Sequence, residues 1–119
     1  MRYRYVSIHS LLIVDLHYVN QDMGLGHEGA GTVEAVGPDA KILKKGDRVG
    51  WGYMHDACGS CKECLEGFNT FCVVRKMYGY ANLDQGSFAD GAVWRESFLF
   101  KLPDNMTDED AAPLVSDAR

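Results

Sequence analysis

Four cysteines clustered in fifteen residues constrain the fold of this chain more than any other feature. They stand at Cys58, Cys61, Cys64 and Cys72, and the chain has no other cysteine. Three thiols at a three-residue spacing can converge on one point when a loop wraps around it, and a fourth can arrive from the far limb of the loop. Four thiolates in a tetrahedron form the closed geometry of a structural zinc site. The spacing therefore predicts a zinc-binding lobe over about residues 55–75.

Two other uses of these cysteines are less favoured. A pair of disulfides would need an oxidising compartment, and the N-terminal residues do not resemble a signal peptide. An iron–sulfur cluster of the bacterial ferredoxin type needs a closer fourth cysteine followed by proline, whereas Cys72 is followed by Val73. We therefore expect a structural zinc ion.

The charge balance narrows the range of partners. Lys and Arg number 12 against 17 Asp and Glu, which gives a formal net charge of −5 at pH 7. Binding to nucleic-acid phosphates needs a basic surface, so we expect no nucleic-acid partner. No stretch of the sequence approaches the roughly 20 apolar residues of a membrane helix. We expect no membrane contact and a cytoplasmic location.

The hydrophobic pattern is that of a mainly β protein. Residues 29–37 and 48–51 are strand-like stretches bounded by glycine turns, and residues 88–102 are rich in aromatic and β-branched types that favour two strands. Thr107 precedes three acidic residues, a pattern typical of a helix start with Thr107 as the N-cap. We expect one mainly β domain over residues 1–119, with the zinc lobe inserted between strands and a short helix start near the C-terminus.

Three motifs in order resemble the zinc-containing medium-chain alcohol dehydrogenases. Residues 26–28 (Gly-His-Glu), followed by Gly31, Gly37 and Ala40, resemble the zinc signature of that family. The four cysteines match its structural-zinc lobe. The Ala-Ala-Pro-Leu run at 111–114 resembles the start of the helix that leads toward its coenzyme domain.

The resemblance implies a GroES-like domain, a partly open β-barrel that the family pairs with a Rossmann domain binding NAD or NADP. The family transfers a hydride between an alcohol and the nicotinamide ring, with zinc acting as a Lewis acid. By matching, His27 would bind the catalytic zinc and Glu28 would be a carboxylate able to approach it. Asp15 would lie behind these ligands, and His17 would relay the alcohol proton. Alcohols or aldehydes would be the substrates.

The sequence also departs from the family pattern at the catalytic zinc. Leu12 stands where the family places its first cysteine, and an alternative alignment places Ile8 there. Ser116 takes the place of the second cysteine. Only His27 and Glu28 remain as ligands, and a catalytic zinc site usually needs three protein ligands. We therefore expect a degenerate catalytic site beside an intact structural one.

The sequence also shows no motif typical of a coenzyme-binding domain. Residues 24–29 formally fit Gly-x-Gly-x-x-Gly, but they open a strand after a polar loop instead of opening a helix after a strand. We expect an incomplete barrel without its Rossmann domain, so that NAD(P) would bind only in a full-length family member. The chain would then be a fragment or an incomplete gene model, inactive by itself. The alternative is a non-catalytic zinc module that forms a homo-oligomer or pairs with a full-length relative.

Three further residues invite a functional reading. His55 precedes the zinc loop and could replace a lost ligand, but we expect an exposed loop residue. Trp51 and Trp94 could line a substrate pocket, but aromatic residues on strands are more often part of the core.

Overall fold

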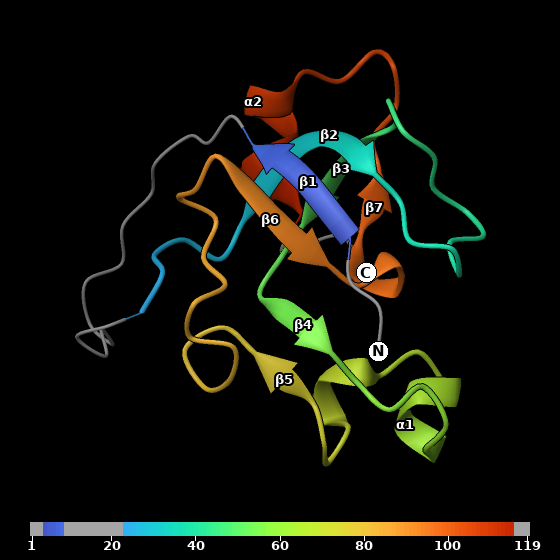
Figure 1. Ribbon diagram of the computed structural model, residues 1–119. Coiled ribbons are helices and arrows are strands. Elements are labelled where there is room, and N and C mark those ends of the chain that lie inside the picture. The colour runs from blue at the N-terminus through green and yellow to red at the C-terminus, as the bar shows by residue number, and fades with distance from the viewer. Residues whose placement is uncertain (1–3, 9–22, 116–119) are drawn as a thin grey trace.

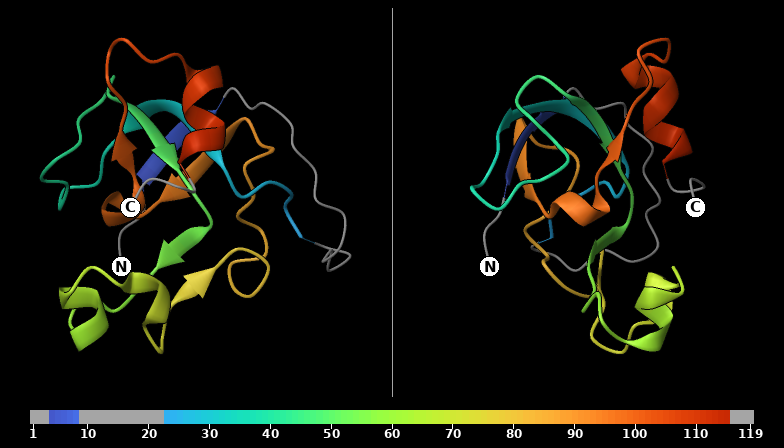
Figure 2. Two further views of the ribbon diagram at one scale, coloured as in Figure 1. Left: turned by 180° about the vertical axis from the view of Figure 1, so that it is seen from behind. Right: turned by 90° about the vertical axis from the view of Figure 1, so that its right-hand side faces the viewer.

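The computed structural model describes residues 4–8 and 23–115. Its main sheet has five strands in the order β6-β1-β2-β3-β7, and each neighbouring pair is antiparallel. The strands are β1 (Arg4–Ile8), β2 (Gly29–Ala35), β3 (Arg48–Trp51), β6 (Gly91–Trp94) and β7 (Phe100–Lys101) (Figure 1). The sheet curves strongly without closing, which confirms the mainly β, partly open barrel expected from the sequence (Figure 2).

Strand β2 begins directly after His27 and Glu28, and its first residue packs closely against β3. Gly29 is in register with Trp51, and a Cβ on Gly29 would lie 2.3 Å from Cζ2 of the indole. Only glycine leaves room for this ring, which is 1% exposed. The indole Nε1 donates a 3.0 Å hydrogen bond to the hydroxyl of Ser87, so the ring is buried with its polar atom satisfied.

A separate lobe projects from one end of the barrel (Figures 1 and 2). Its two short strands, β4 (Met54–Asp56) and β5 (Lys76–Met77), pair antiparallel and form the stem. Between them lie the helix α1 (Lys62–Leu65) and the 3-10 helix η1 (Asn69–Phe71). The lobe therefore occupies the position in the chain that the cysteine spacing predicted.

The C-terminal part of the described chain packs at the other end of the barrel from the lobe (Figure 2). Helix α2 (Asp108–Ala111) begins at Thr107, whose hydroxyl accepts a hydrogen bond from the amide of Asp110, so the predicted N-cap is confirmed. The 3-10 helix η3 (Ala112–Leu114) follows directly. Arg48 of β3 holds this segment, because its guanidinium donates to the Asp108 carboxylate and to the Met106 carbonyl.

The 3-10 helix η2 (Glu96–Phe98) separates β6 from β7, so the predicted pair of strands in residues 88–102 is confirmed with a helical turn between them. The Glu96 carboxylate accepts hydrogen bonds from the amides of Lys41, Ile42 and Leu43 at 2.8–3.2 Å. This carboxylate ties the loop that precedes β3 to the connection between β6 and β7. Within the described residues, no helix is long and apolar enough to cross a membrane.

The barrel and the lobe share one hydrophobic core. The larger of two buried clusters includes barrel residues and residues of the lobe, with Cys61 and Cys64 packed against it. Its buried members are Val33, Leu43, Val49, Trp51, Ala57, Cys72, Trp94, Phe98 and Leu99. Because Ala57 and Cys72 belong to this cluster, the lobe cannot fold independently of the barrel without exposing apolar surface.

The expectation for His55 is wrong. The residue lies on β4, is only 3% exposed, and packs edge-on against the Trp94 ring with the ring centroids 4.7 Å apart. Neither of its ring nitrogens has a hydrogen-bond partner. His55 is buried because Trp94, which is distant in sequence, covers it, and no local pattern encodes that contact. The prediction that Trp51 and Trp94 belong to the core is confirmed, since both are 1% exposed.

Candidate metal centre

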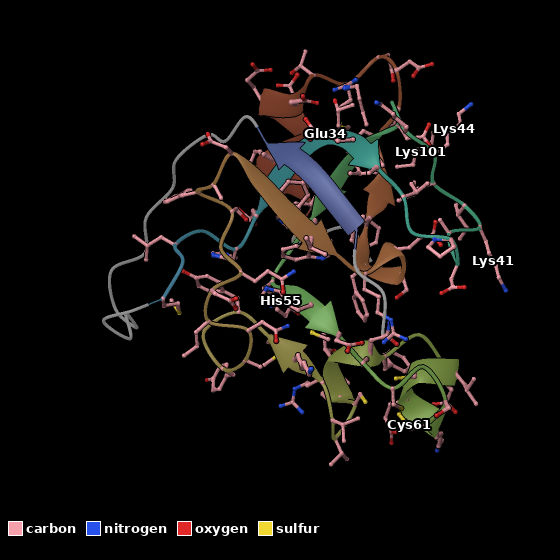
Figure 3. All side chains as sticks on the ribbon, viewed as in Figure 1. Glu34, Lys41, Lys44, His55, Cys61 and Lys101 are labelled. Atoms are coloured by element: carbon pink, nitrogen blue, oxygen red, sulfur yellow. The ribbon has the colours of Figure 1, made fainter. Side chains whose placement is uncertain are left out.

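The four cysteine sulfurs converge in the lobe, where Cys61 is labelled in Figure 3. The four Sγ atoms all lie within 4.8 Å of one another, and the Cys58 and Cys64 sulfurs are 3.9 Å apart. All four thiols are free, so the structure contains neither of the two disulfides considered above. Four sulfurs at this spacing surround a single point, as the sequence predicted.

Short local elements bring each cysteine to that point. Gly59 has a φ of +72°, which side-chain-bearing residues rarely adopt, and it lets the chain turn sharply after Cys58. Cys61 stands at the N-cap position of α1, and Cys64 lies within that helix. Cys72 follows η1 from the other limb of the lobe and is buried. One limb of the lobe thus supplies three sulfurs to the cluster, and the other limb supplies the fourth.

Backbone amides point at two of the sulfurs. The amides of Ser60 and Cys61 donate to Cys58 Sγ at 3.4 and 3.2 Å, and the amide of Cys58 lies 3.5 Å from Cys72 Sγ. The hydrogen bond from the Ser60 amide, followed by that from Cys61, lowers the pKa of the Cys58 thiol to about 6. The thiolate is the form that binds metals, so these amides prepare Cys58 as a ligand.

The donor set fits zinc. Four soft sulfur ligands select zinc over the hard oxygen-seeking cations. Zn–S bonds of about 2.3 Å in a tetrahedron would separate neighbouring sulfurs by about 3.8 Å, close to the 3.9 Å between Cys58 and Cys64. All four positions of such an ion would be filled by protein, which is typical of a structural site without an open position for substrate.

His27 and Glu28 lie apart from this cluster, at the entry to β2, and both are half-buried. The His27 imidazole packs against the Tyr78 ring with centroids 5.4 Å apart. Among the described residues, the cysteine cluster is the one group of three or more side chains arranged to hold a metal. The described residues therefore do not complete a second metal site at His27. Asp15, His17, Leu12 and Ser116 lie outside the described residues.

The segment around His27 is held by a loop that the sequence did not single out. The amide of Gly24 donates to the Leu83 carbonyl, and the amides of Ser87 and Phe88 donate to the carbonyls of Gly26 and Leu25. A Cβ on Gly24 would lie 2.9 Å from the amide nitrogen of Gly86, so the two backbones are in close contact. Gly24 and Gly86 could have indicated that two backbones approach closely, but a glycine does not show which segment lies against it.

Comparison with known proteins identifies the family. The model of the alcohol dehydrogenase GroES-like domain family matches residues 3–104. The chain belongs to this family, whose members resembling it are zinc-type medium-chain alcohol dehydrogenases.

Two curated relatives illustrate the match. An alcohol dehydrogenase of Geobacillus stearothermophilus is 42% identical over 89 residues, which cover 75% of this chain and 26% of the relative. Cinnamyl alcohol dehydrogenase 8 of Arabidopsis thaliana is 35% identical over 113 residues, covering 85% of this chain and 32% of the relative. The chain thus spans about a quarter to a third of these relatives.

Solved structures agree with this assignment. The protein CAD from Helicobacter pylori, solved as a complex with NADP(H), superposes with a TM-score of 0.83 at 27% identity, over 96% of this chain and 38% of that one. The alcohol dehydrogenase of Thermus sp. ATN1 gives a TM-score of 0.74 at 33% identity, over 90% of this chain and 34% of that one. The GroES-like fold expected from the sequence is therefore confirmed.

Proposed function

We propose that these residues form the zinc-binding catalytic-domain portion of an NAD(P)-dependent alcohol dehydrogenase. The observation that carries the proposal is the family match over residues 3–104, together with four cysteine sulfurs gathered within 4.8 Å in the lobe. The reaction would be hydride transfer between an alcohol and the nicotinamide ring, and the substrates would be alcohols or aldehydes.

The lobe supplies stability in this proposal and takes no part in the chemical step. A zinc ion held by Cys58, Cys61, Cys64 and Cys72 has no free position for a substrate oxygen. Its binding would be linked to folding, because the cysteines pack against the same core as the barrel strands. Structural zinc sites of this kind can contribute on the order of 10 kcal/mol to folding.

In this proposal the catalytic zinc site is degenerate in these residues. His27 and Glu28 would be the remaining ligands of a catalytic zinc, with Asp15 behind them and His17 as proton relay. All four cysteines of the chain lie in the lobe cluster, so none is left to supply the thiolates that the family uses at the catalytic metal. We propose that the 119-residue chain alone does not oxidise alcohols.

NAD(P) would bind outside the described residues. Helices α1 and α2 are four residues long each, and the glycine pattern at 24–29 leads into β2. A dinucleotide-binding turn instead follows a strand and opens a helix, whose N-terminus faces the pyrophosphate. We propose that a Rossmann domain beyond these residues, of the kind the family pairs with its barrel, supplies the cofactor site.

One observation favours a second candidate, a non-catalytic zinc-binding module derived from this family. The structural cluster uses all the thiols, and His27 packs against Tyr78 without a third ligand among the described residues. Such a module would act through a homo-oligomer or by pairing with a full-length relative.

The two candidates can be separated by assay of the purified chain. We expect no NAD(P)H formation from ethanol or cinnamyl alcohol, and no quenching or enhancement of NADH fluorescence on adding the protein. The Geobacillus stearothermophilus relative serves as the positive control. Recovery of turnover when the chain is mixed with a separately expressed coenzyme domain of that relative would favour the catalytic-domain proposal over the non-catalytic module, and it would mean that His27 and Glu28 have found further zinc ligands. Turnover by the 119 residues alone would contradict the degenerate catalytic site.

A further inference from the structure

Two short segments that are distant in the sequence meet where the lobe joins the barrel. His55, Asp56 and Ala57 of the stem face Trp94 and Arg95 at the end of β6, and we call these five residues the lobe junction. The His55 and Trp94 rings pack edge to face. Figure 3 shows His55 at this junction, between the barrel and the lobe that carries Cys61.

Arg95 makes the polar contacts of the lobe junction. Its Nη1 donates to the Asp56 carboxylate, which is 17% exposed, and to the carbonyl of Ala57 at 3.0 Å. The same carboxylate oxygen of Asp56 accepts a hydrogen bond from the Ala57 amide at 2.8 Å. Arg95 and Asp56 together therefore hold both backbone polar groups of Ala57, which is itself buried in the shared core.

The Ala57 carbonyl and the Cys58 amide belong to one planar peptide unit. Arg95 fixes the carbonyl side of this unit, and the amide on its other side is directed at the sulfur of Cys72. Cys58 is a ligand from the first limb of the lobe, and Cys72 is the ligand from the second. The orientation of this single peptide therefore affects how both limbs approach the metal.

We propose that Arg95 is a positioning residue for the zinc site, acting through the Ala57–Cys58 peptide. A charged donor on the carbonyl polarises the peptide and strengthens hydrogen bonding by its amide. Groups that orient metal ligands in this way typically account for a 10–100-fold difference in metal affinity. This inference rests on the proposed zinc site, and it adds a barrel residue to the groups that determine zinc affinity.

The chain provides a closely matched control. Arg48 also donates to one carboxylate and one backbone carbonyl, those of Asp108 and Met106. It joins β3 to the segment around α2, at the end of the barrel away from the lobe (Figure 2). Arg48→Gln and Arg95→Gln therefore remove equivalent interactions, and only the second removes a contact of the peptide that precedes a metal ligand.

The test measures zinc release into a chromophoric chelator and competition for zinc, using the full 119-residue chain. We expect Arg95→Gln to weaken zinc binding by at least about tenfold, and Arg48→Gln to leave it unchanged. The cobalt-substituted protein gives a spectroscopic readout, and the sulfur-to-cobalt charge-transfer band should shift in Arg95→Gln alone. Arg95→Lys keeps a charged nitrogen with more than one N–H donor, and Arg95 makes both contacts through one nitrogen. This variant should therefore bind zinc more tightly than Arg95→Gln.

Unchanged zinc affinity and an unchanged cobalt band in Arg95→Gln would overturn the inference, even if its melting temperature fell. Zinc binding by Arg95→Lys as weak as that by Arg95→Gln would also overturn it, because a charged donor would then not be responsible. If Arg95→Gln does not fold, Asp56→Asn removes the carboxylate that holds the Arg95 guanidinium, and we expect weakened zinc binding there too. A wild-type chain that binds no zinc would instead refute the proposed zinc site itself.

Discussion

His55 should make the stability of this protein depend on pH between about 6.5 and 4. The imidazole is buried at the lobe junction with neither nitrogen hydrogen-bonded. Burial lowers the pKa of His55 from 6.5 to about 4, and the nearby Asp84 charge opposes this shift only in part. The folded state therefore favours the neutral ring, whereas the unfolded chain takes up a proton near pH 6.5.

The direction and the size of this change in the free energy of unfolding follow from proton linkage. Below pH 6.5 the unfolded state binds more protons at His55 than the folded state, so the free energy of unfolding falls as the pH falls. For pKa values of 6.5 and about 4, the contribution lost between pH 7.5 and 5.5 is about 1.3 kcal/mol. The full loss, approached only near pH 4, would be about 3 kcal/mol.

The assay is urea unfolding of the wild type and His55→Leu at pH 7.5 and 5.5, with zinc at a fixed concentration. Leucine fills a similar volume and does not titrate. Protonation of the cysteines affects both proteins, so it cancels in the difference between their pH dependences. We expect the wild type to lose about 1 kcal/mol more than His55→Leu. Equal losses in the two proteins would refute the assignment of this pH dependence to His55.

Two further predictions concern the division between the lobe and the barrel. Cys61→Ser or Cys64→Ser should abolish soluble expression, because each removes a zinc ligand. His27→Ala should change the melting temperature little. Thermal melts showing the reverse order would contradict this division. Gly29→Ala should destabilise the barrel by about 1–3 kcal/mol, because the new methyl group would clash with Trp51. Urea unfolding checks this value, and an unchanged midpoint would show that the indole can move.

Features encoded by local sequence were predictable. The cysteine spacing predicted the lobe and the clustering of its sulfurs, because a turn at Gly59 and the single helical turn of α1 are enough to gather three of them. The cap at Thr107 was equally accessible, since its hydrogen bond spans three residues. The family resemblance supplied the barrel, which the strand patterns by themselves indicated only as mainly β.

Features that depend on distant contacts were not predictable. The burial of His55 requires Trp94, and the bond from Trp51 to Ser87 joins residues 36 positions apart. Arg95 likewise has no local motif, although its contact with Ala57 lies next to Cys58. The roles of Asp15 and His17 remain predictions.

The most direct test of the account is the zinc content per chain, measured by elemental analysis of protein purified without added metal. We predict one zinc per chain, both in the wild type and in His27→Ala. Two zinc ions would contradict the degenerate catalytic site, because His27 and Glu28 would then have found further ligands. No zinc in the wild-type chain would contradict the central claim that the four cysteines form a structural metal site.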